Sequence, residues 1–201
     1  MPRLTRDFFV RDTLTVAREL LGQRLVRVWE GGRLVGRVVE VEAYVGEEDR
    51  ACHARCGRTE RNRAMYGPAG HAYVYFVYGM HHCLNVVTDQ EGFPAAVLVR
   101  AVEPLEGIET MRARRGGRPA LQLVSGPARL CQALAIDRRF DGADLCAADA
   151  RLFIEAGAGV SDEHVAAGSR VGVRGDEAAL TAPWRLYVRD SEYVSHRKGR
   201  R

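Results

Sequence analysis

Lysine is almost absent from this chain of 201 residues. Of its 30 basic residues 29 are arginine, and Lys198 is the single lysine. An enzyme that works through a Schiff base needs a reactive lysine or a free terminal amine. Amine chemistry is therefore left with two candidates, namely Lys198 in a basic C-terminal stretch and Pro2, which becomes the terminal amine if Met1 is removed.

Long apolar runs are missing as well. No segment approaches the ~18 apolar residues that a membrane span requires, and residues 1–7 lack the apolar stretch of an export signal. The cysteines are odd in number, and without an export signal we expect reduced thiols rather than a disulfide framework. They are Cys52, Cys56, Cys83, Cys131 and Cys146. These absences predict a cytoplasmic protein with no membrane partner.

The composition is that of an ordinary globular protein, with 46% hydrophobic residues, 28% charged residues and a formal charge of +4. A chain of this length holds one or at most two domains. The arginines are clustered, because five lie between Arg50 and Arg63 with one acid, and further basic groups lie over 112–118 and 195–201. Such clusters suit a polyanionic partner, although a solvated arginine-rich face gives the same pattern.

The N-terminal part predicts a helix followed by a hairpin. Apolar residues at helical spacing indicate a helix over 13–21. Valine-rich segments over 23–28 and 34–44 indicate two strands, and Gly31-Gly32 between them supplies the positive φ angles of a tight turn. Residues 45–71 show no periodicity and are expected to form a long surface loop, which at this length is usually functional or disordered.

The rest of the chain predicts more strands, with two helices inserted among them. The helices should start at Pro104 and at Ser125-Gly126-Pro127, and their inward residues should be Leu105, Ile108, Met111, Leu130 and Leu134. The strands are expected over 72–78, 83–88, 95–99, 152–155, 170–173 and 184–188. This order indicates an α+β fold in one domain over 1–201, with a flexible basic tail over about 195–201.

The strand over 34–44 places acidic groups together. Alternation puts Glu40, Glu42 and Tyr44 on one face and Val39, Val41 and Ala43 on the other. Two carboxylates and a phenol on one face suit acid–base chemistry. The same pattern also fits an ordinary sheet with one face in water.

Three tyrosines fall within six residues in the next hairpin. Tyr78 lies with Gly79 at the expected tip, where a large ring is normally left in water. An exposed aromatic tip beside basic loops suggests a wedge or a stacking platform for nucleic-acid bases. Tyr73 and Tyr75, taken singly, fit packing within the sheet equally well.

Several ordered motifs resemble the alkyladenine (3-methyladenine) DNA glycosylase family. They are Val41-Glu42-Ala43-Tyr44, His53, Arg61-Asn62-Arg63-Ala64-Met65, Tyr73-Val74-Tyr75-Phe76-Val77-Tyr78-Gly79-Met80 and Cys83-Leu84-Asn85. The likeness continues through segments 97–107, 125–127, 170–173 and 183–185, so that it covers nearly the whole chain. It implies a single α+β domain built on a curved antiparallel β-sheet, with peripheral helices and a protruding β-hairpin.

The resemblance also implies a reaction. A monofunctional glycosylase flips an alkylated or deaminated purine out of duplex DNA and hydrolyses its N-glycosidic bond, with no cofactor and no metal. The reaction passes through an oxocarbenium-like sugar, which a carboxylate can stabilise while it takes a proton from water. Glu42 matches the family's catalytic glutamate, and Arg100 matches the arginine that holds the water.

The remaining site residues follow from the same resemblance. Tyr44, His53 and Tyr75 match residues around the flipped base, and Asn85 matches one that disfavours the amino group of guanine. Tyr78 matches the residue that fills the gap in the base stack. Met65 and Leu98 match packing residues, for which a plain core role is equally good. Only the family match prefers Glu42 to its neighbour Glu40.

The implied partner is double-stranded DNA with damaged purines, acted on by a monomer in the cytoplasm at the nucleoid, or in the nucleus of a eukaryote. The preferred lesion is left open. Two departures from the family pattern concern loop shape and duplex contacts, because Glu60 stands where proline is common and His82 where an aromatic is usual.

Three other interpretations stay open. A metal could use Cys52, His53 and Cys56, or the run of residues 81–83, but neither spacing fits a structural zinc site. A Schiff-base glycosylase/lyase could use Pro2, although the residues after it are not the acidic start expected of such enzymes. A non-catalytic DNA-binding module of the same fold would need the basic clusters but not Glu42.

Overall fold

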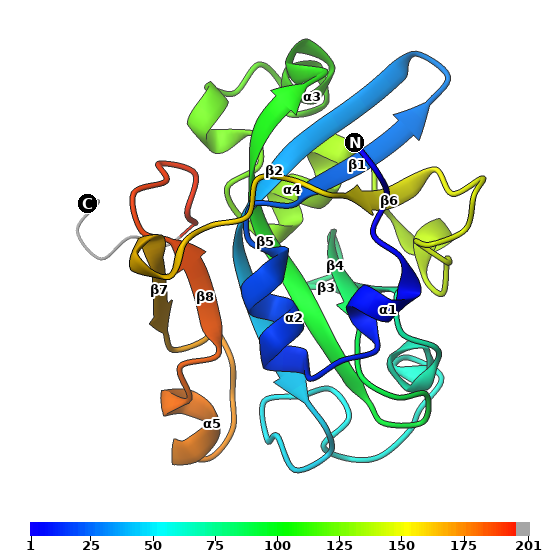
Figure 1. Cartoon of the computed structure of the whole chain (residues 1–201), viewed down its shortest axis with the longest axis vertical. Coiled ribbons are helices and arrows are strands. Elements are labelled where there is room, and N and C mark those ends of the chain that lie inside the picture. Colours follow the sequence, from blue (N-terminus) through cyan, green and yellow to red (C-terminus); the bar gives the residue numbers. More distant parts are fainter. Residues whose placement is uncertain (196–201) are drawn as a thin grey trace.

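The protein is built on one antiparallel β-sheet. Its strands are β1 (Arg24–Trp29), β2 (Gly32–Val45), β3 (Ala72–Val77), β4 (His81–Val87), β5 (Ala95–Glu106), β6 (Leu152–Glu155), β7 (Val165–Gly168) and β8 (Arg185–Val188). The computed structural model describes residues 1–195, and within them the strand order is β3-β4-β5-β2-β1-β6, with β8 paired to β2 and β7 to β8 (Figure 1). The long strands β2 and β5 form the centre of the molecule.

The helices are short and lie around this sheet. They are α1 (Arg6–Phe9), α2 (Thr13–Leu20), α3 (Ile108–Arg114), α4 (Pro127–Leu134) and α5 (Glu177–Thr181), with 3₁₀ turns at Arg63–Tyr66, Ala120–Gln122, Arg138–Phe140 and Asp162–His164. Asp12 caps α2 by accepting a hydrogen bond from the Thr15 amide at 2.8 Å. Figure 1 shows α2 lying across β2 and β5, with α3 at one end of the sheet and α5 at the other. The predicted α+β class is confirmed.

Alternating side chains divide between the two faces of the sheet. Val41, Ala43 and Val97 belong to the main core, which includes buried residues of α2 and α4 such as Leu20 and Leu130. A smaller cluster on the other face contains Tyr73, Val87 and Ala96, with Tyr44 and Tyr75 packed against it. The alternation predicted along β2 is confirmed for Val41, Ala43, Glu42 and Tyr44. It is wrong at Val39, because the register shifts beside Glu40 and Val38 joins the main core instead. The second face is left free to build a site.

One predicted helix begins later than expected. Strand β5 continues through Pro104, which lies opposite Gly36 beside a register shift in the sheet, a position where proline is tolerated in a strand. Leu105 is 44% exposed rather than inward. Helix α3 starts only after Gly107, whose φ of 74° turns the chain out of the strand.

The strand predicted over 170–173 is also wrong. The strand in this region is β7, and residues 170–173 follow it as an irregular segment. Gly172 has a φ of 70°, which an extended strand does not allow, and the Val171 amide donates to a side chain rather than to a neighbouring strand. Ser195 at the start of the predicted tail is held in place by two contacts described below, while residues 196–201 lie outside the described residues.

Candidate active site

A cavity of ≈ 440 Å³ opens on the second face of the sheet, beside the long loop after β2. All nine residues predicted for the site from the sequence line it: Glu42, Tyr44, His53, Met65, Tyr75, Tyr78, Asn85, Leu98 and Arg100. Its wall also contains Ala51, Arg55, Tyr73, Val77, Cys83, Pro127, Val171, Gly172, Val173 and Arg174. The fold therefore brings every predicted residue to one place, although they are spread over β2, β3, β4, β5 and two loops.

Glu42 is the carboxylate at the cavity wall. It lies on β2, and three donors surround it although its side chain is buried. Its Oε1 accepts a hydrogen bond from the Val171 amide at 2.6 Å and lies 3.1 Å from Nη1 of Arg100. Its Oε2 accepts from the Tyr44 hydroxyl at 2.9 Å. These contacts fix the carboxylate in one orientation.

Glu40 lies on the same face but is enclosed by protein. It is fully buried and does not line the cavity. Its Oε1 accepts from Arg100 and from Arg185, at 3.1 and 2.9 Å, and its Oε2 accepts from the Ser195 amide at 2.7 Å. Burial raises the pKa of Glu40, but Arg100 and the hydrogen bonds from Ser195 outweigh it and hold the pKa below its ordinary value. Of the two carboxylates, only Glu42 reaches the cavity.

Arg100 faces both carboxylates because the sheet is irregular beside it. Ala101 pairs with Glu40 and Val99 pairs with Val41, so that Arg100 stands at a register shift between β2 and β5. Such a bulge re-aims a side chain, and bulges are common next to active sites. Burial lowers the pKa of Arg100, but the nearby carboxylates of Glu42 and Glu40 outweigh this effect and raise the pKa above its ordinary value. The guanidinium therefore stays charged although Arg100 is only 4% exposed.

Five aromatic rings line the cavity, those of Tyr44, His53, Tyr73, Tyr75 and Tyr78. His53 lies 4.5 Å from Tyr75 between ring centroids, edge to face, and its Nδ1 is 2.9 Å from the Tyr73 hydroxyl. Burial, with Arg61 and Arg55 nearby, lowers the pKa of His53 to about 4, so the imidazole is neutral at pH 7. Burial raises the pKa of Tyr44 well above its ordinary value, and the Glu42 carboxylate adds to the effect. The cavity therefore offers flat, uncharged faces beside one carboxylate.

Asn85, Met65 and Leu98 complete the wall. Asn85 lies on β4 opposite Tyr73, and its side-chain amide donates to the Tyr73 carbonyl at 2.9 Å. Met65 belongs to the smaller hydrophobic cluster, and Leu98 pairs with both Glu42 and Asn85 across the sheet. All three are nearly buried, which suits residues that set the shape of the cavity.

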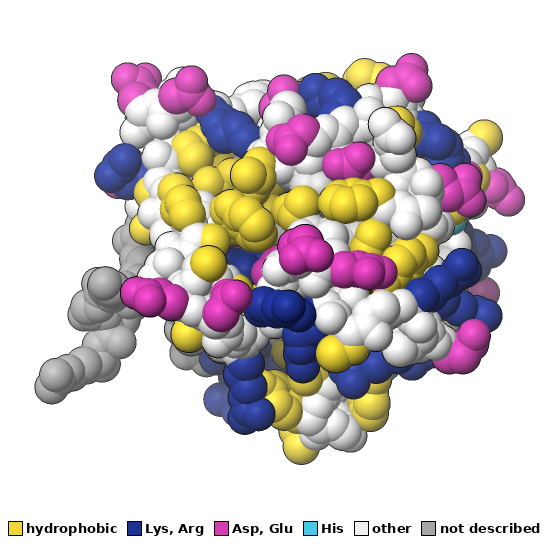
Figure 2. All heavy atoms as spheres, turned by 90° about the horizontal axis from the view of Figure 1, so that it is seen from below, with side chains coloured by type: hydrophobic (Ala, Val, Ile, Leu, Met, Phe, Trp, Pro, Cys, Tyr) yellow, Lys and Arg dark blue, Asp and Glu magenta, His cyan; other side chains and the backbone are white. Residues whose placement is uncertain are grey.

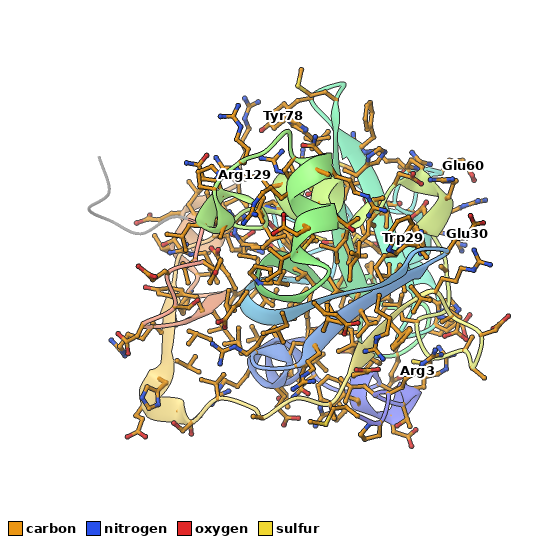
Figure 3. All side chains as sticks on the ribbon, turned by 90° about the horizontal axis from the view of Figure 1, so that it is seen from above. Arg3, Trp29, Glu30, Glu60, Tyr78 and Arg129 are labelled. Atoms are coloured by element: carbon orange, nitrogen blue, oxygen red, sulfur yellow. The ribbon has the colours of Figure 1, made fainter. Side chains whose placement is uncertain are left out.

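Tyr78 lies at the tip of the β3–β4 hairpin and is 83% exposed. Tyr78 and Gly79 have φ values of 53° and 67°, as in the primed turns that match the twist of a hairpin. A left-handed backbone costs an ordinary residue about 1–2 kcal/mol. The geometry of the turn therefore does not favour a tyrosine at this position. Figure 3 shows Tyr78 at the outer edge of the molecule, with Arg129 toward the same edge.

Arg170 anchors the segment that covers Glu42. Its guanidinium binds both oxygens of Asp49, at 2.5 and 2.8 Å, and donates to the Ala43 carbonyl at 3.0 Å. It also lies between the rings of Tyr44 and Trp184, at 4.8 and 4.9 Å from their centroids. The anchor fixes Tyr44 and, through the next residue in the chain, the Val171 amide.

The two residues that depart from the family pattern, Glu60 and His82, do not line the cavity. Glu60 is exposed and pairs with Arg63 at 3.4 Å, and the ring of His82 packs 4.9 Å from that of Phe76.

Within residues 1–195 no group of three or more His, Cys, Asp and Glu side chains is arranged to hold a metal ion. The cysteines, all inside the described range, form no disulfide, and none of the helices described there is long and apolar enough to cross a membrane.

Sequence reasoning missed three contributors to the site. Ser195 contacts Glu40 and Arg100 from a stretch that was expected to be a tail. Arg170 and Val171 were expected in a strand. A signal for them was present in the segment Arg170-Val171-Gly172-Val173, because a glycine inside so short a segment weakens a strand.

Comparison with known proteins agrees with the family resemblance found in the sequence motifs. A family model described as methylpurine-DNA glycosylase matches residues 7–192. A relative from Methanocella arvoryzae is 50% identical over 98% of this chain and 98% of its own length. Relatives from Carboxydothermus hydrogenoformans and Myxococcus xanthus are 47% and 50% identical, each over 96% of this chain and over 98% and 93% of their own lengths. All three have "3-methyladenine DNA glycosylase" in their names.

Proposed function

Because the chain belongs to the methylpurine-DNA glycosylase family, we propose that it removes alkylated or deaminated purines from duplex DNA by hydrolysing their N-glycosidic bonds. The single observation that supports this most is a buried carboxylate, Glu42, at the wall of a cavity lined by aromatic rings. A base in a duplex exposes only its edges, so the damaged nucleotide is flipped into this cavity before the reaction.

The cavity suits a flipped purine. Its volume of ≈ 440 Å³ lies within the range of small-molecule sites. Tyr44, Tyr75 and the neutral ring of His53 offer faces and edges for stacking, which is worth roughly 1–3 kcal/mol per base. An electron-poor alkylated purine stacks better than an undamaged one. Asn85 lies in the cavity wall, and we assign to it the role of disfavouring the exocyclic amino group of guanine.

Glu42 and Arg100 carry the chemistry in this proposal. The bond between base and sugar breaks with its electron pair leaving on the base, and the sugar becomes oxocarbenium-like. Alkylation weakens this bond in advance. The Glu42 carboxylate stabilises the positive sugar and accepts a proton as water forms the new bond to the sugar carbon. Arg100, 3.1 Å from Glu42, helps to hold that water.

Tyr78 fills the space that the flipped nucleotide leaves. Its exposure at a hairpin tip fits an aromatic wedge between base pairs. Basic residues at the cavity rim, among them the exposed Arg55 and Arg174, face the phosphates beside the lesion. With DNA as its substrate, we place the enzyme in the cytoplasm at the nucleoid and expect it to act as a monomer.

A Schiff-base mechanism is less well supported. The carbonyl of Pro2 accepts a hydrogen bond from Ala156, just after β6, and Pro2 does not line the cavity. Arg3, the next residue, lies on the opposite side of the molecule from Tyr78 in Figure 3. Lys198 lies outside the described residues. Hydrolysis by water at Glu42 therefore remains the proposed reaction.

The variant Glu42→Gln tests this proposal against a non-catalytic DNA-binding module. It keeps the shape of the side chain but removes the base. The single-turnover release of methylated bases from dimethyl sulfate-treated duplex DNA should fall about 10²- to 10⁴-fold. Affinity for a duplex carrying an abasic-site analogue should change little. A variant that releases bases at the wild-type rate would show that Glu42 is not the base, and a wild-type protein that binds but releases nothing would favour the binding module.

A further inference from the structure

Glu40 is the centre of a buried ion cluster next to the proposed catalytic pair. Its Oε1 is shared by Nε of Arg100 and Nη1 of Arg185, and its Oε2 accepts from the Ser195 amide. Both guanidinium groups lie within hydrogen-bond distance of the Glu40 carboxylate, in the protein interior, where removing one partner of a buried ion pair is costly. With Glu42 added, the cluster holds two carboxylates and two guanidinium groups and is electrically balanced.

The guanidinium of Arg100 is divided among three acceptors. Nε donates to Glu40 at 3.1 Å, Nη2 donates to the Ser195 hydroxyl at 3.1 Å, and Nη1 lies 3.1 Å from Glu42. Arginine prefers to bind a carboxylate through two parallel hydrogen bonds. Here Glu42 has a contact with one nitrogen only, at Oε1, while its Oε2 faces the Tyr44 hydroxyl.

We propose that Glu40 is a positioning residue that holds Arg100 away from a two-point pair with Glu42. Glu40, assisted by Ser195, occupies Nε and Nη2, so that Glu42 is touched by one nitrogen and keeps the capacity to bind water and take its proton. Without the negative charge of Glu40, the guanidinium turns toward the remaining carboxylate and occupies both of its oxygens. This inference rests on the proposed function, because it matters only if Glu42 has to bind a water molecule and take its proton.

A purely structural role for Glu40 makes a different prediction. In that case its loss lowers the stability of the fold and slows the reaction only through the fraction of unfolded protein. The chain offers a matched control, because Glu155 on β6 is also nearly buried and binds an arginine, Arg33, at 3.0 Å, yet it does not line the cavity. Comparing Glu40→Gln with Glu155→Gln separates the loss of a buried, arginine-bound carboxylate from the loss of positioning.

The experiment measures single-turnover release of methylated bases from dimethyl sulfate-treated duplex DNA, affinity for an abasic-analogue duplex, and the thermal midpoint. Glu40→Gln should lower the release rate about 100-fold, since small misplacements of reacting groups cost this much, with affinity within about 2-fold of wild type. Ser195→Ala keeps its backbone amide on Glu40 and loses one acceptor of Arg100, so it should show a smaller loss of the same kind. Glu155→Gln should lower the thermal midpoint and leave the release rate of the folded protein unchanged.

Two results would overturn the inference. One is a wild-type release rate in folded Glu40→Gln. The other is an equal loss of rate in Glu40→Gln and Glu155→Gln that tracks the thermal midpoint. If Glu40→Gln does not fold, Ser195→Ala decides, because wild-type kinetics in that variant would also refute positioning. Failure of the proposed function is recognised separately, since Glu42→Gln would then keep full activity, or the wild type would have none.

Discussion

His53 shows how one side chain in the cavity responds to pH. Its folded pKa of about 4 lies below its ordinary value of 6.5, with burial as the main cause. Between these values the unfolded chain binds a proton that the folded protein does not, so stability falls as the pH drops through this window. We therefore expect wild type to lose about 2 kcal/mol more unfolding free energy than His53→Gln between pH 7 and pH 5. Urea denaturation at both pH values measures this difference.

The comparison with His53→Gln cancels the carboxylates, which also respond to acid. An equal loss in both proteins would mean that the folded cavity accepts a proton on His53. A neutral His53 matters for the proposed substrate, since an imidazolium in the cavity wall would repel a positively charged alkylated purine. The part of the acid sensitivity that the comparison isolates is thus expected to come from His53, which the cavity keeps neutral.

The individual site residues were predictable where they sit in regular strands. Alternation along β2 placed Glu42 and Tyr44 on one face, and the structure agrees. Alternation could not separate Glu42 from Glu40, because the difference arises from Arg185 and Ser195, which cover Glu40 from distant parts of the chain. Contacts of this kind depend on tertiary packing and leave no local pattern in the sequence.

At the level of whole elements, turn chemistry was easier to predict than strand ends. The hairpin tip at Tyr78-Gly79 and the helix from Pro127 are both confirmed. The errors at Pro104 and over 170–173 have different physical origins. A register shift lets β5 continue through a proline, and a left-handed glycine breaks a valine-rich segment that otherwise favours a strand.

The β3–β4 hairpin should act as a wedge through the ring of Tyr78. We expect Tyr78→Asn to weaken binding to an abasic-analogue duplex by roughly 5- to 150-fold, since one stacked ring contributes about 1–3 kcal/mol. Asparagine tolerates the left-handed backbone, so the hairpin should keep its shape and the thermal midpoint should not fall. Fluorescence anisotropy measures the affinity. Tyr78→Phe keeps the ring and serves as the control, and an unchanged affinity in Tyr78→Asn would refute the wedge.

For the whole molecule, the arrangement of charge matters more than its total. Figure 2 views the end where α5 and the loop after β2 lie, and acidic, basic and apolar side chains are mixed on that face. A net charge of +4 spread in this way does not attract DNA to every surface equally. Binding should depend instead on the arginines around the cavity, such as Arg55 and Arg174.

This distribution predicts how the affinity for undamaged duplex DNA depends on salt. Each phosphate contact releases counterions, so the logarithm of the binding constant should fall linearly with the logarithm of salt concentration. Arg55→Gln at the cavity rim should reduce the slope by about 1. Arg11→Gln removes an arginine that is paired with Glu19 at 2.7 Å and does not line the cavity, so its slope should match wild type. Anisotropy titrations at several salt concentrations give these slopes. Equal reductions in both variants would mean that DNA responds to net charge alone and not to a surface centred on the cavity.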